Sequence, residues 1–478
     1  MRPVRLGLAV AAVTGGIGLA LTCLAAGVPS PPHDDRAQAA LARGENPWPV
    51  KLRRPVQASL SAMAELGKLE FMDTSLSVSG RQSCATCHMP DHAYGPGGDA
   101  PAVLGGPHMT LQGVRPPPSL EYLEEEPAFS VGPDDEENEN VTLAQMVAQS
   151  QDIARPTKTA DSTAQSAAAL VPQGGLFWDG RADSLEQQAT GPLLNPLEMA
   201  NTSIHAVAEK LRHASYAKRF VQLFGSTILR NDSLLVDEAT FALARYQIEN
   251  VDFHPFTSKF DDWLEGRARM TPAEMRGYVL YNDPDKANCG GCHVDTVGPN
   301  GEPPLFTDHQ FEALGVPRNP ALKANADPAY HDLGLCGPWR TDMRNQTAYC
   351  GMFITPTLRN VARRHVFFHN GRYTTLQQVL DFYDYRDVDP GRIYPRGPDG
   401  KVEKYNDIPA AYRANVDVTD PPFDRHPGEQ PAMTPQEEQD IIAFLGTLTD
   451  GYRPDRPSVT PSRDRSGDRP AAAVHPAP

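Results

Sequence analysis

The chain has 478 residues, a length that allows two or three domains with hydrophobic cores of their own and excludes a small disulfide scaffold. Its 60 Asp and Glu residues outnumber its 44 Lys and Arg residues, which gives a formal net charge of -16. This charge argues against binding to nucleic acid and predicts that any macromolecular partner is neutral or basic.

The first 30 residues have the pattern of an export segment. Arg2 and Arg5 precede an uncharged stretch from Leu6 to Ala26, and a proline-rich turn follows at residues 29–32. The stretch is longer than the apolar core of about 7–15 residues that is usual in a signal peptide. A cleaved signal peptide and an uncleaved inner-membrane anchor therefore both stay open. Either one predicts that the rest of the chain lies in the periplasm, because the two arginines remain on the cytoplasmic side of the membrane.

A short motif with two cysteines and a histidine occurs twice. "SCATCH" at residues 83–88 and "NCGGCH" at residues 288–293 each place an imidazole directly after the second of two thiols. Covalent haem c needs this spacing, because the thiols bind the two vinyl groups and the imidazole reaches the iron from one side. Zinc is disfavoured because the two pairs lie far apart, and a thioredoxin-type centre because no strand-to-helix pattern precedes them. We therefore predict two covalently attached haem c groups, held by Cys84, Cys87, His88, Cys289, Cys292 and His293, with His88 and His293 as proximal iron ligands.

Between the motifs lies an acidic run, "EYLEEEPAFSVGPDDEENEN", at residues 121–140. It could dock a basic electron donor, but its composition favours a solvated loop.

Helix signals dominate the chain. The runs "AELGKLEFMD" (residues 64–73) and "AEMRGYVLYND" (residues 273–283) precede the two motifs, are both amphipathic, and each contain a glycine. Capping patterns predict helix starts after Ser184, Thr271, Thr375 and Thr434, and apolar residues keep helical spacing at 204–211 and 376–383. The predicted fold class is mainly α, with two cytochrome-c-like haem domains and long irregular loops. The predicted boundaries are 45–252 for the N-terminal domain and 253–450 for the C-terminal domain, followed by a disordered tail at 451–478.

Two cysteines remain outside the motifs once the export segment is set aside. Cys336 and Cys350 lie in a part of the chain that is predicted to be exported, where a disulfide can persist. We expect them to pair, and two free buried thiols are the alternative.

Five segments resemble the bacterial di-haem cytochrome c peroxidases and their MauG relatives, in family order over most of residues 60–450. They are "LGKLEFMDTSLSVSGRQSCATCH", "GGLFWDGRADSLEQQATGPLLNPLEMA", "FTDHQFEALGVP", "GMFITPTLRNVARRHVFFHNGRYTTLQQVLDFY" and "TPQEEQDIIAFLGTL". The resemblance implies two c-type domains that face each other, with peroxide reacting at the N-terminal haem while the C-terminal haem transfers or stores oxidising equivalents.

The resemblance also implies catalytic roles for Trp178, Gln188 and Glu198. Trp178 stands at the position of the aromatic residue between the haems, and Gln188 and Glu198 at the positions of the polar pair above the peroxide-reactive iron. The chemistry is consistent, since one carboxylate can move a proton between the two peroxide oxygens while an amide positions them without titrating. Without the resemblance, a core aromatic, a surface glutamine and a helix-capping glutamate are the simpler interpretations.

Tyr383 decides which branch of the family the chain resembles. Conventional members place a Met at the sixth position of the C-terminal haem, whereas MauG-like members place a Tyr there, and Tyr383 stands at that position in "TTLQQVLDFY". A phenolate favours higher oxidation states of iron than a thioether does. Tyr383 also lies on the apolar side of its helix, so a core role stays open, as does ligation by Met343 or Met352.

Other positions depart from the family pattern. Neither His92 nor His108 stands where conventional members carry the histidine that closes the N-terminal iron, so an open five-coordinate site is expected. Pro116 and Arg364 occupy positions where the family's interhaem calcium has Asn and Thr, which argues against calcium. Glu312 replaces a common His in "FEALG".

These observations predict an exported di-haem c-type oxidoreductase that reduces hydrogen peroxide. Its partner is a small electron donor such as a cytochrome c or a cupredoxin, or a protein substrate. The alternative is a di-haem electron-transfer cytochrome without peroxide chemistry.

Overall fold

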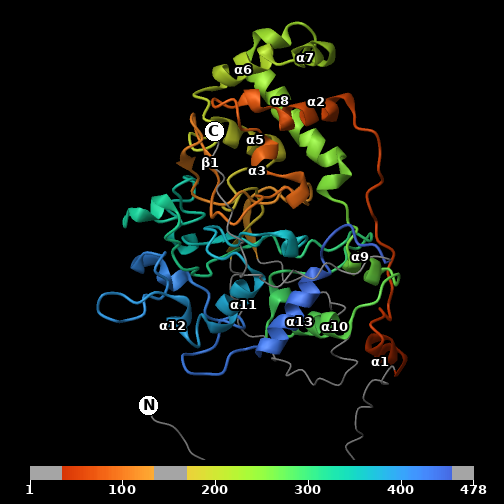
Figure 1. Cartoon of the computed structure of the whole chain (residues 1–478), viewed down its shortest axis with the longest axis vertical. Coiled ribbons are helices and arrows are strands. Elements are labelled where there is room, and N and C mark those ends of the chain that lie inside the picture. The colour runs from red at the N-terminus through yellow and green to blue at the C-terminus, as the bar shows by residue number, and fades with distance from the viewer. Residues whose placement is uncertain (1–34, 134–169, 455–478) are drawn as a thin grey trace, which may run out of the picture.

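The structure is a computed structural model that describes residues 35–133 and 170–454 (Figure 1). The predicted export segment lies outside the described residues, as does the predicted tail from residue 455 onward. The start of that tail, predicted to be disordered from residue 451, is instead ordered, because the backbone N–H groups of Gly451 and Tyr452 bond to Thr257. In the described part, helices are the main regular elements and the strands are short, so the predicted mainly α class is confirmed.

The helices gather at two ends of the molecule (Figure 1). The upper end in the figure, which we call the N-terminal half, contains α2 (Ala62–Met72), α3 (Cys84–Cys87), α5 (Leu185–Leu194), α6 (Ile204–His213), α7 (Ala217–Phe224) and α8 (Asp232–Glu249). The lower end, the C-terminal half, contains α9 (Lys259–Leu264), α10 (Pro272–Tyr281), α11 (Leu376–Tyr385), α12 (Pro390–Ile393) and α13 (Pro435–Gly446), with α1 (Asp35–Ala42) beside it.

Short antiparallel strand pairs lie in the loops of the described chain. They are β1 (Leu104–Gly105) with β2 (Leu111–Gln112), β3 (Ser130–Pro133) with β4 (Leu170–Gln173), and β5 (Phe311–Glu312) with β6 (Phe353–Ile354). In register, Ser130 faces Gln173 and Phe311 faces Ile354. An isolated bridge from Gln173 to Gln310 connects the second pair to the third, so these strands join the two halves.

The four predicted helix starts are present. At Thr271 and Thr434 the capping box is complete, because the cap hydroxyl and a glutamate carboxylate each accept a backbone N–H of the other residue. At Ser184 and Thr375 the hydroxyl also caps the helix, but the glutamine three residues later accepts the N–H of the residue before the cap. The first turn is therefore fixed in all four helices.

Glycines let one helix pair cross closely in each half. A Cβ on Gly67 of α2 would lie 1.9 Å from the Ala242 carbonyl oxygen of α8. A Cβ on Gly277 of α10 would lie 1.9 Å from the Asp440 carbonyl oxygen of α13. The two similar glycine-containing runs in the sequence thus form the same kind of crossing in both halves.

Replacing Gly277 with Ala should destabilise the protein by about 3 kcal/mol, because the added methyl group forces α10 and α13 apart. Gly446 at the end of α13 is the matched control, since a Cβ there meets nothing within 4 Å. Gly446→Ala should stabilise the protein by about 0.5–1 kcal/mol. Chemical denaturation of both holoprotein variants measures the difference, and equal unfolding midpoints would contradict a tight crossing.

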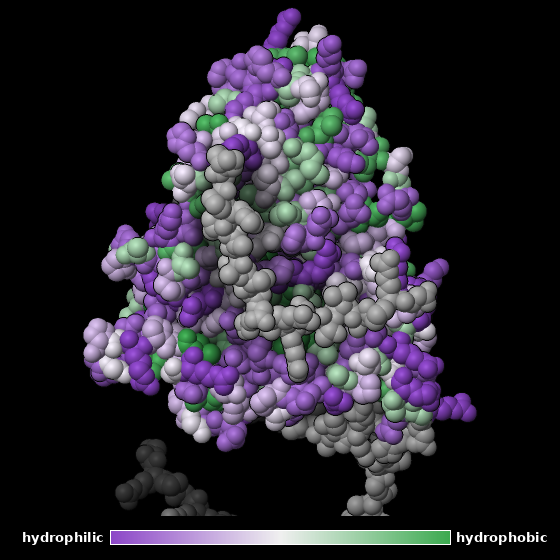
Figure 2. Space-filling view, in the orientation of Figure 1, coloured by the Kyte–Doolittle hydropathy of each residue, from purple (hydrophilic) through white to green (hydrophobic). Residues whose placement is uncertain are grey.

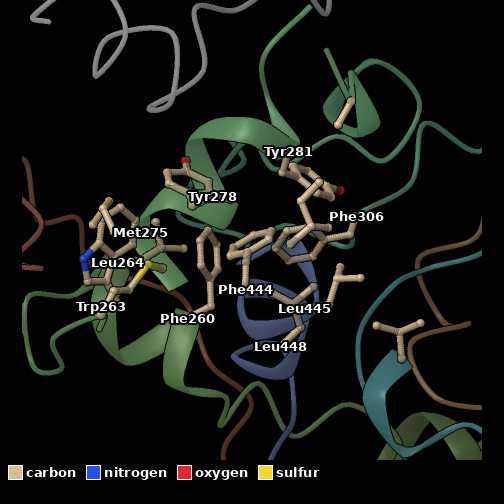
Figure 3. Close-up of a cluster of buried hydrophobic side chains, with 14 of the residues drawn as sticks. Phe260, Trp263, Leu264, Met275, Tyr278, Tyr281, Phe306, Phe444, Leu445 and Leu448 are labelled. Atoms are coloured by element: carbon tan, nitrogen blue, oxygen red, sulfur yellow. The ribbon is translucent and has the colours of Figure 1, made fainter. Parts of the chain in front are cut away.

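Each half has a hydrophobic core of its own. The C-terminal core is rich in aromatic side chains, which meet edge to face between α9, α10 and α13 (Figure 3). Its central members are Phe260, Trp263, Tyr278, Tyr281, Phe306 and Phe444. The N-terminal core is mostly aliphatic and includes Leu66, Leu193, Val207, Phe220 and Leu235.

Residues before α2 lie against the C-terminal half. The Asn46 side chain and the Val50 backbone both donate hydrogen bonds to the Leu264 carbonyl oxygen, at 3.0 and 2.9 Å. Arg54 forms an ion pair with Glu265 at 2.6 Å. The division into domains at 45–252 and 253–450 stays a prediction.

The start of the acidic run is buried at Glu121 and Tyr122, so a solvated loop was the wrong interpretation for these two residues. Glu121 is only 4% exposed, and its carboxylate accepts a hydrogen bond from Asn360 at 2.6 Å. Glu126 pairs with His309 at 2.9 Å. These partners come from the C-terminal half, so a local count of charges could not reveal them. Residues 134–140 lie outside the described residues.

Burial and the nearby Asp450 raise the pKa of Glu121 from 4.5 to about 8. Because the folded-state pKa is the higher one, the stability that this group contributes is complete below pH 4.5 and is lost as the pH rises through 8. Glu121→Gln should therefore match the wild type in acid and be more stable by on the order of 2 kcal/mol above pH 8. Denaturation across this pH range tests it, with the exposed Glu125→Gln as control. An equal gain in both variants would contradict the assignment.

The surface drawn in Figure 2 is mostly hydrophilic. Within residues 35–133 and 170–454, no helix is both long and apolar enough to cross a membrane.

Candidate functional site

The first cysteine motif forms one helical turn. Ser83 stands at the N-cap of α3, and the His88 backbone N–H closes the turn on the Cys84 carbonyl oxygen at 2.8 Å. His88 Nδ1 lies 3.0 Å from the Tyr94 carbonyl oxygen, which can only accept, so Nδ1 carries the proton. Burial lowers the pKa of His88 to about 4. The imidazole is thus neutral, and its Nε2 lone pair is available to a metal.

The second motif has the same chemistry on a tighter turn. Cys289–Gly291 is a 3-10 helix, and a Cβ on Gly290 would lie 2.3 Å from the Asn282 amide oxygen, so a larger residue would force the Asn282 side chain to move. His293 Nδ1 lies 3.0 Å from the Phe306 carbonyl oxygen, and burial lowers the pKa of His293 to about 4. Its Nδ1 therefore also carries the proton, which makes Nε2 the nitrogen that can bind a metal.

Each motif opens into a cavity. We call them the His88 cavity, which Cys84 and Cys87 also line, and the His293 cavity, which Cys289 and Cys292 also line. All four thiols are free of disulfides, whereas Cys336 and Cys350 pair with Cα atoms 5.0 Å apart, as predicted. Free thiols beside a neutral, oriented imidazole fit the attachment of haem c in both cavities.

Gln188 and Glu198 both line the His88 cavity. Gln188 is on α5 and 8% exposed, and Glu198 lies in the turn after α5, where the Asn195 side-chain amide donates to its carboxylate at 2.6 Å. Burial raises the pKa of Glu198, and the nearby Arg181 guanidinium opposes that rise. The structure thus places both Gln188 and Glu198 in the wall of the cavity that the neutral His88 also lines.

Trp178 lines both cavities, together with the segment 116–118. The indole Nε1 donates to the Pro116 carbonyl oxygen at 3.0 Å, and the Trp178 carbonyl oxygen accepts the Ile354 backbone N–H at 3.1 Å. These bonds tie the indole to one half and its backbone to β6 of the other. Trp178 therefore forms part of the wall between the two cavities.

Tyr383 lines the His293 cavity from α11 and stacks on Phe423 with ring centroids 5.3 Å apart. Burial raises the pKa of its phenol, so the site favours neutral Tyr unless a cation stands beside it. Neither Met343 nor Met352 is among the described residues that line this cavity, but Met433 is. Tyr383 therefore stays a candidate ligand. Met433 is a second candidate, a thioether that was not predicted from the sequence.

The two remaining histidine candidates lie away from the first iron site. His92 lines the His293 cavity, and His108 lines neither cavity. Of the described residues that line the His88 cavity, only His88 is a histidine.

Pro116 and Arg364, the two residues that make calcium binding doubtful, both lie at the cavities. Pro116 lies between the cavities and uses its carbonyl oxygen for Trp178. Arg364 lines the His293 cavity, and burial lowers its pKa to about 10. Neither side chain offers an oxygen ligand, and the argument against calcium stays a prediction. Glu312 also lines the His293 cavity, where burial and nearby aspartates raise its pKa to about 8.

A mainly helical chain with two C-x-x-C-H motifs, two cavities that fit haem, and a shared aromatic wall has the architecture of a di-haem c-type oxidoreductase. Comparison with known proteins agrees. The family model described as di-haem cytochrome c peroxidase matches residues 61–269. The methylamine utilization protein MauG of Paracoccus denitrificans is 33% identical over 356 residues, which cover 73% of this chain and 79% of that protein. Cytochrome c551 peroxidase of Nitrosomonas europaea is 30% identical over 349 residues, which cover 71% of this chain and 77% of that protein.

Among solved structures, the diheme peroxidase BthA from Burkholderia thailandensis superposes with a TM-score of 0.69 at 33% identity, covering 85% of this chain and 94% of that chain. Its tyrosine-to-methionine variant gives the same TM-score at 34% identity, covering 85% of this chain and 93% of that chain. The chain belongs to the di-haem cytochrome c peroxidase and MauG family, and it is a peroxide-dependent oxidoreductase.

Several residues of the two sites were not found from the sequence. They are Asn195 and Arg181 beside Glu198, Trp339 in the wall of the His88 cavity, and Met433 and His369 in the wall of the His293 cavity. Arg181 and Asn195 lie inside the "FWDGRA…NPLEM" segment, so its resemblance to the family could have pointed to them. Trp339 and Met433 lie in loops and are brought in by long-range packing.

Proposed function

We propose that this chain is an exported enzyme that consumes hydrogen peroxide in the His88 cavity, at a haem held by Cys84, Cys87 and His88. Haem iron supplies the redox chemistry when it is bound. The observation that carries the proposal is that Gln188 and Glu198 face the cavity of a neutral His88, with no second histidine among the described lining residues. The His88 cavity then contains both space for an oxidant and a carboxyl group that exchanges protons.

Glu198 is the proposed proton carrier. Reduction of peroxide requires a proton to leave one oxygen and to reach the other, and a single carboxylate can perform both transfers. The raised pKa of Glu198 brings its titration closer to neutral pH, where proton exchange in both directions is efficient. Gln188, which does not titrate, is proposed to orient the oxygens through its amide.

The second haem is proposed to be held by Cys289, Cys292 and His293, with the Tyr383 oxygen as its sixth ligand. A phenolate ligand favours the oxidised metal, so this site would share oxidising equivalents with the His88 cavity. Trp178 is proposed to couple the two sites, because it lines both cavities. Ligation by Tyr383 would make the enzyme MauG-like.

We propose a periplasmic location, with residues 1–30 as a signal peptide or an inner-membrane anchor. The reductant is proposed to be a small electron donor such as a cytochrome c or a cupredoxin, and a protein substrate is the other outcome of the same chemistry. The negative net charge of -16 supports a neutral or basic partner.

Turnover of the holoprotein tests this proposal. The chain is produced in a host that attaches haem c, and reduced cytochrome c is mixed with it and with hydrogen peroxide. Loss of the reduced cytochrome spectrum only when enzyme and peroxide are both present is the expected result. If peroxide changes neither the haem spectrum nor the oxidation of the donor, the chain is a di-haem electron-transfer cytochrome instead.

A further inference from the structure

A second tryptophan reaches the His88 cavity, and it comes from the other half of the molecule. Trp339 lies in the loop between β5 and β6, yet its side chain lines the cavity that contains Cys84, Cys87 and His88. Trp178 lines both cavities, whereas Trp339 is found only in the wall of the first. Trp339 is also partly exposed to solvent. It therefore stands between the first site and the surface.

The loop that carries Trp339 is held on both sides. On one side, Cys336 forms the disulfide with Cys350. On the other side, Arg340 crosses to the N-terminal half, where its guanidinium donates to the carbonyl oxygens of Asp179 and Gly180 at 3.0 and 2.9 Å. Those two residues directly follow Trp178. Both indoles are thus fixed with respect to the same short segment.

Arg340 has further support, because its guanidinium lies over the Phe129 ring at 3.6 Å and pairs with Asp342 at 2.8 Å. The disulfide and the buried Arg340 guanidinium therefore fix the backbone on both sides of the indole. The arrangement places Trp339 reproducibly in the cavity wall.

The Trp339 indole lies beside the Tyr330 phenol, and both rings are oxidisable. Trp339 Nε1 is buried, and the nearby Tyr330 hydroxyl is its side-chain partner. Buried tryptophan N–H groups usually find a partner. Indole is among the side chains that are oxidised most readily.

We propose that Trp339 is a redox-active residue that carries oxidising equivalents from the His88 cavity to the surface at the 336–350 loop. The proposal rests on the proposed function above. One electron passes from the indole to the oxidised site in the cavity and leaves an indole radical cation. A one-electron donor at the surface, such as a phenol or a reduced small redox protein, then restores the neutral indole. Two such transfers supply the two electrons that one peroxide requires.

Two variants separate this role from simple packing. Trp339→Phe keeps an aromatic ring in the wall but removes the easily oxidised indole, whereas Trp339→Tyr keeps an oxidisable ring. Trp48→Phe is the control, because Trp48 packs against the C-terminal core and lines neither cavity. Each holoprotein receives peroxide without a donor. Peptide mass spectrometry then locates oxygen added to tryptophan, and the haem spectrum gives the lifetime of the oxidised state.

In the wild type, oxygen addition should concentrate on Trp339 and spare Trp48 and Trp263. The oxidised state should last severalfold longer in Trp339→Phe than in the wild type, and Trp339→Tyr should restore a short lifetime. Equal lifetimes in the wild type, Trp339→Phe and Trp339→Tyr would overturn the proposal while leaving peroxide chemistry intact. If peroxide does not change the haem spectrum of the wild type, the proposed function and this inference are both overturned.

Discussion

Glu198→Gln should slow the reaction of the holoenzyme with hydrogen peroxide by about 100-fold or more, the loss that is typical when a general acid–base group is removed. The substitution keeps the size of the side chain and an oxygen that accepts the Asn195 hydrogen bond, so the cavity should keep its shape. What it removes is the ability to take up and release a proton. Stopped-flow absorbance of the haem bands measures the rate.

The pH dependence of that rate gives a second readout. Because burial raises the pKa of Glu198, the carboxylate forms only at a pH above the usual range for glutamate. The wild-type rate should rise with pH through that pKa, and the rate of Glu198→Gln should not follow this rise. Glu186→Gln is the control, since Glu186 lies on the same α5 segment and does not line the His88 cavity. A Glu198→Gln rate near that of the wild type would mean that another group carries the proton.

Tyr383→Met should raise the reduction potential of the second haem by on the order of 100 mV or more, because axial ligands set haem potentials over a wide range. A thioether stabilises the reduced iron, whereas a phenolate stabilises the oxidised iron. Tyr383→Phe should instead leave the second iron without its sixth ligand and add a high-spin signal. Redox titration and electron paramagnetic resonance measure the two effects.

Tyr385→Phe is the matched control for these variants, since Tyr385 is on α11 but does not line the His293 cavity. The reduction potential and the spin state of the second haem in Tyr385→Phe should equal those in the wild type. If Tyr383→Phe also leaves both unchanged, the phenol is a core residue and the ligand must come from another side chain, with Met433 as the first candidate in the cavity wall.

The sequence predicted those features that depend on local spacing. The haem motifs require residues within five positions, the helix starts depend on caps three residues apart, and both proved to be present. The glycines in the two similar runs were visible as well, although only the structure shows that each admits a neighbouring helix. Pairing of Cys336 with Cys350 followed from the compartment and the cysteine count.

Features that depend on contacts between distant segments could not be predicted in this way. Glu121 belongs to a run that looks solvated, but it is buried against Asn360, which is far along the chain. Trp339 and Met433 carry no local pattern that sets them apart from ordinary loop residues. Gln188, Glu198 and Trp178 were found because a long segment resembles a family, not because their spacing predicts a shared cavity.

Electron paramagnetic resonance of the oxidised holoprotein shows whether one of the two covalently bound haems keeps an open position for peroxide. We expect one high-spin ferric signal from the iron at His88 and one low-spin signal from the iron at His293. Two low-spin signals, with no high-spin component at any pH at which the protein is folded, would contradict this expectation.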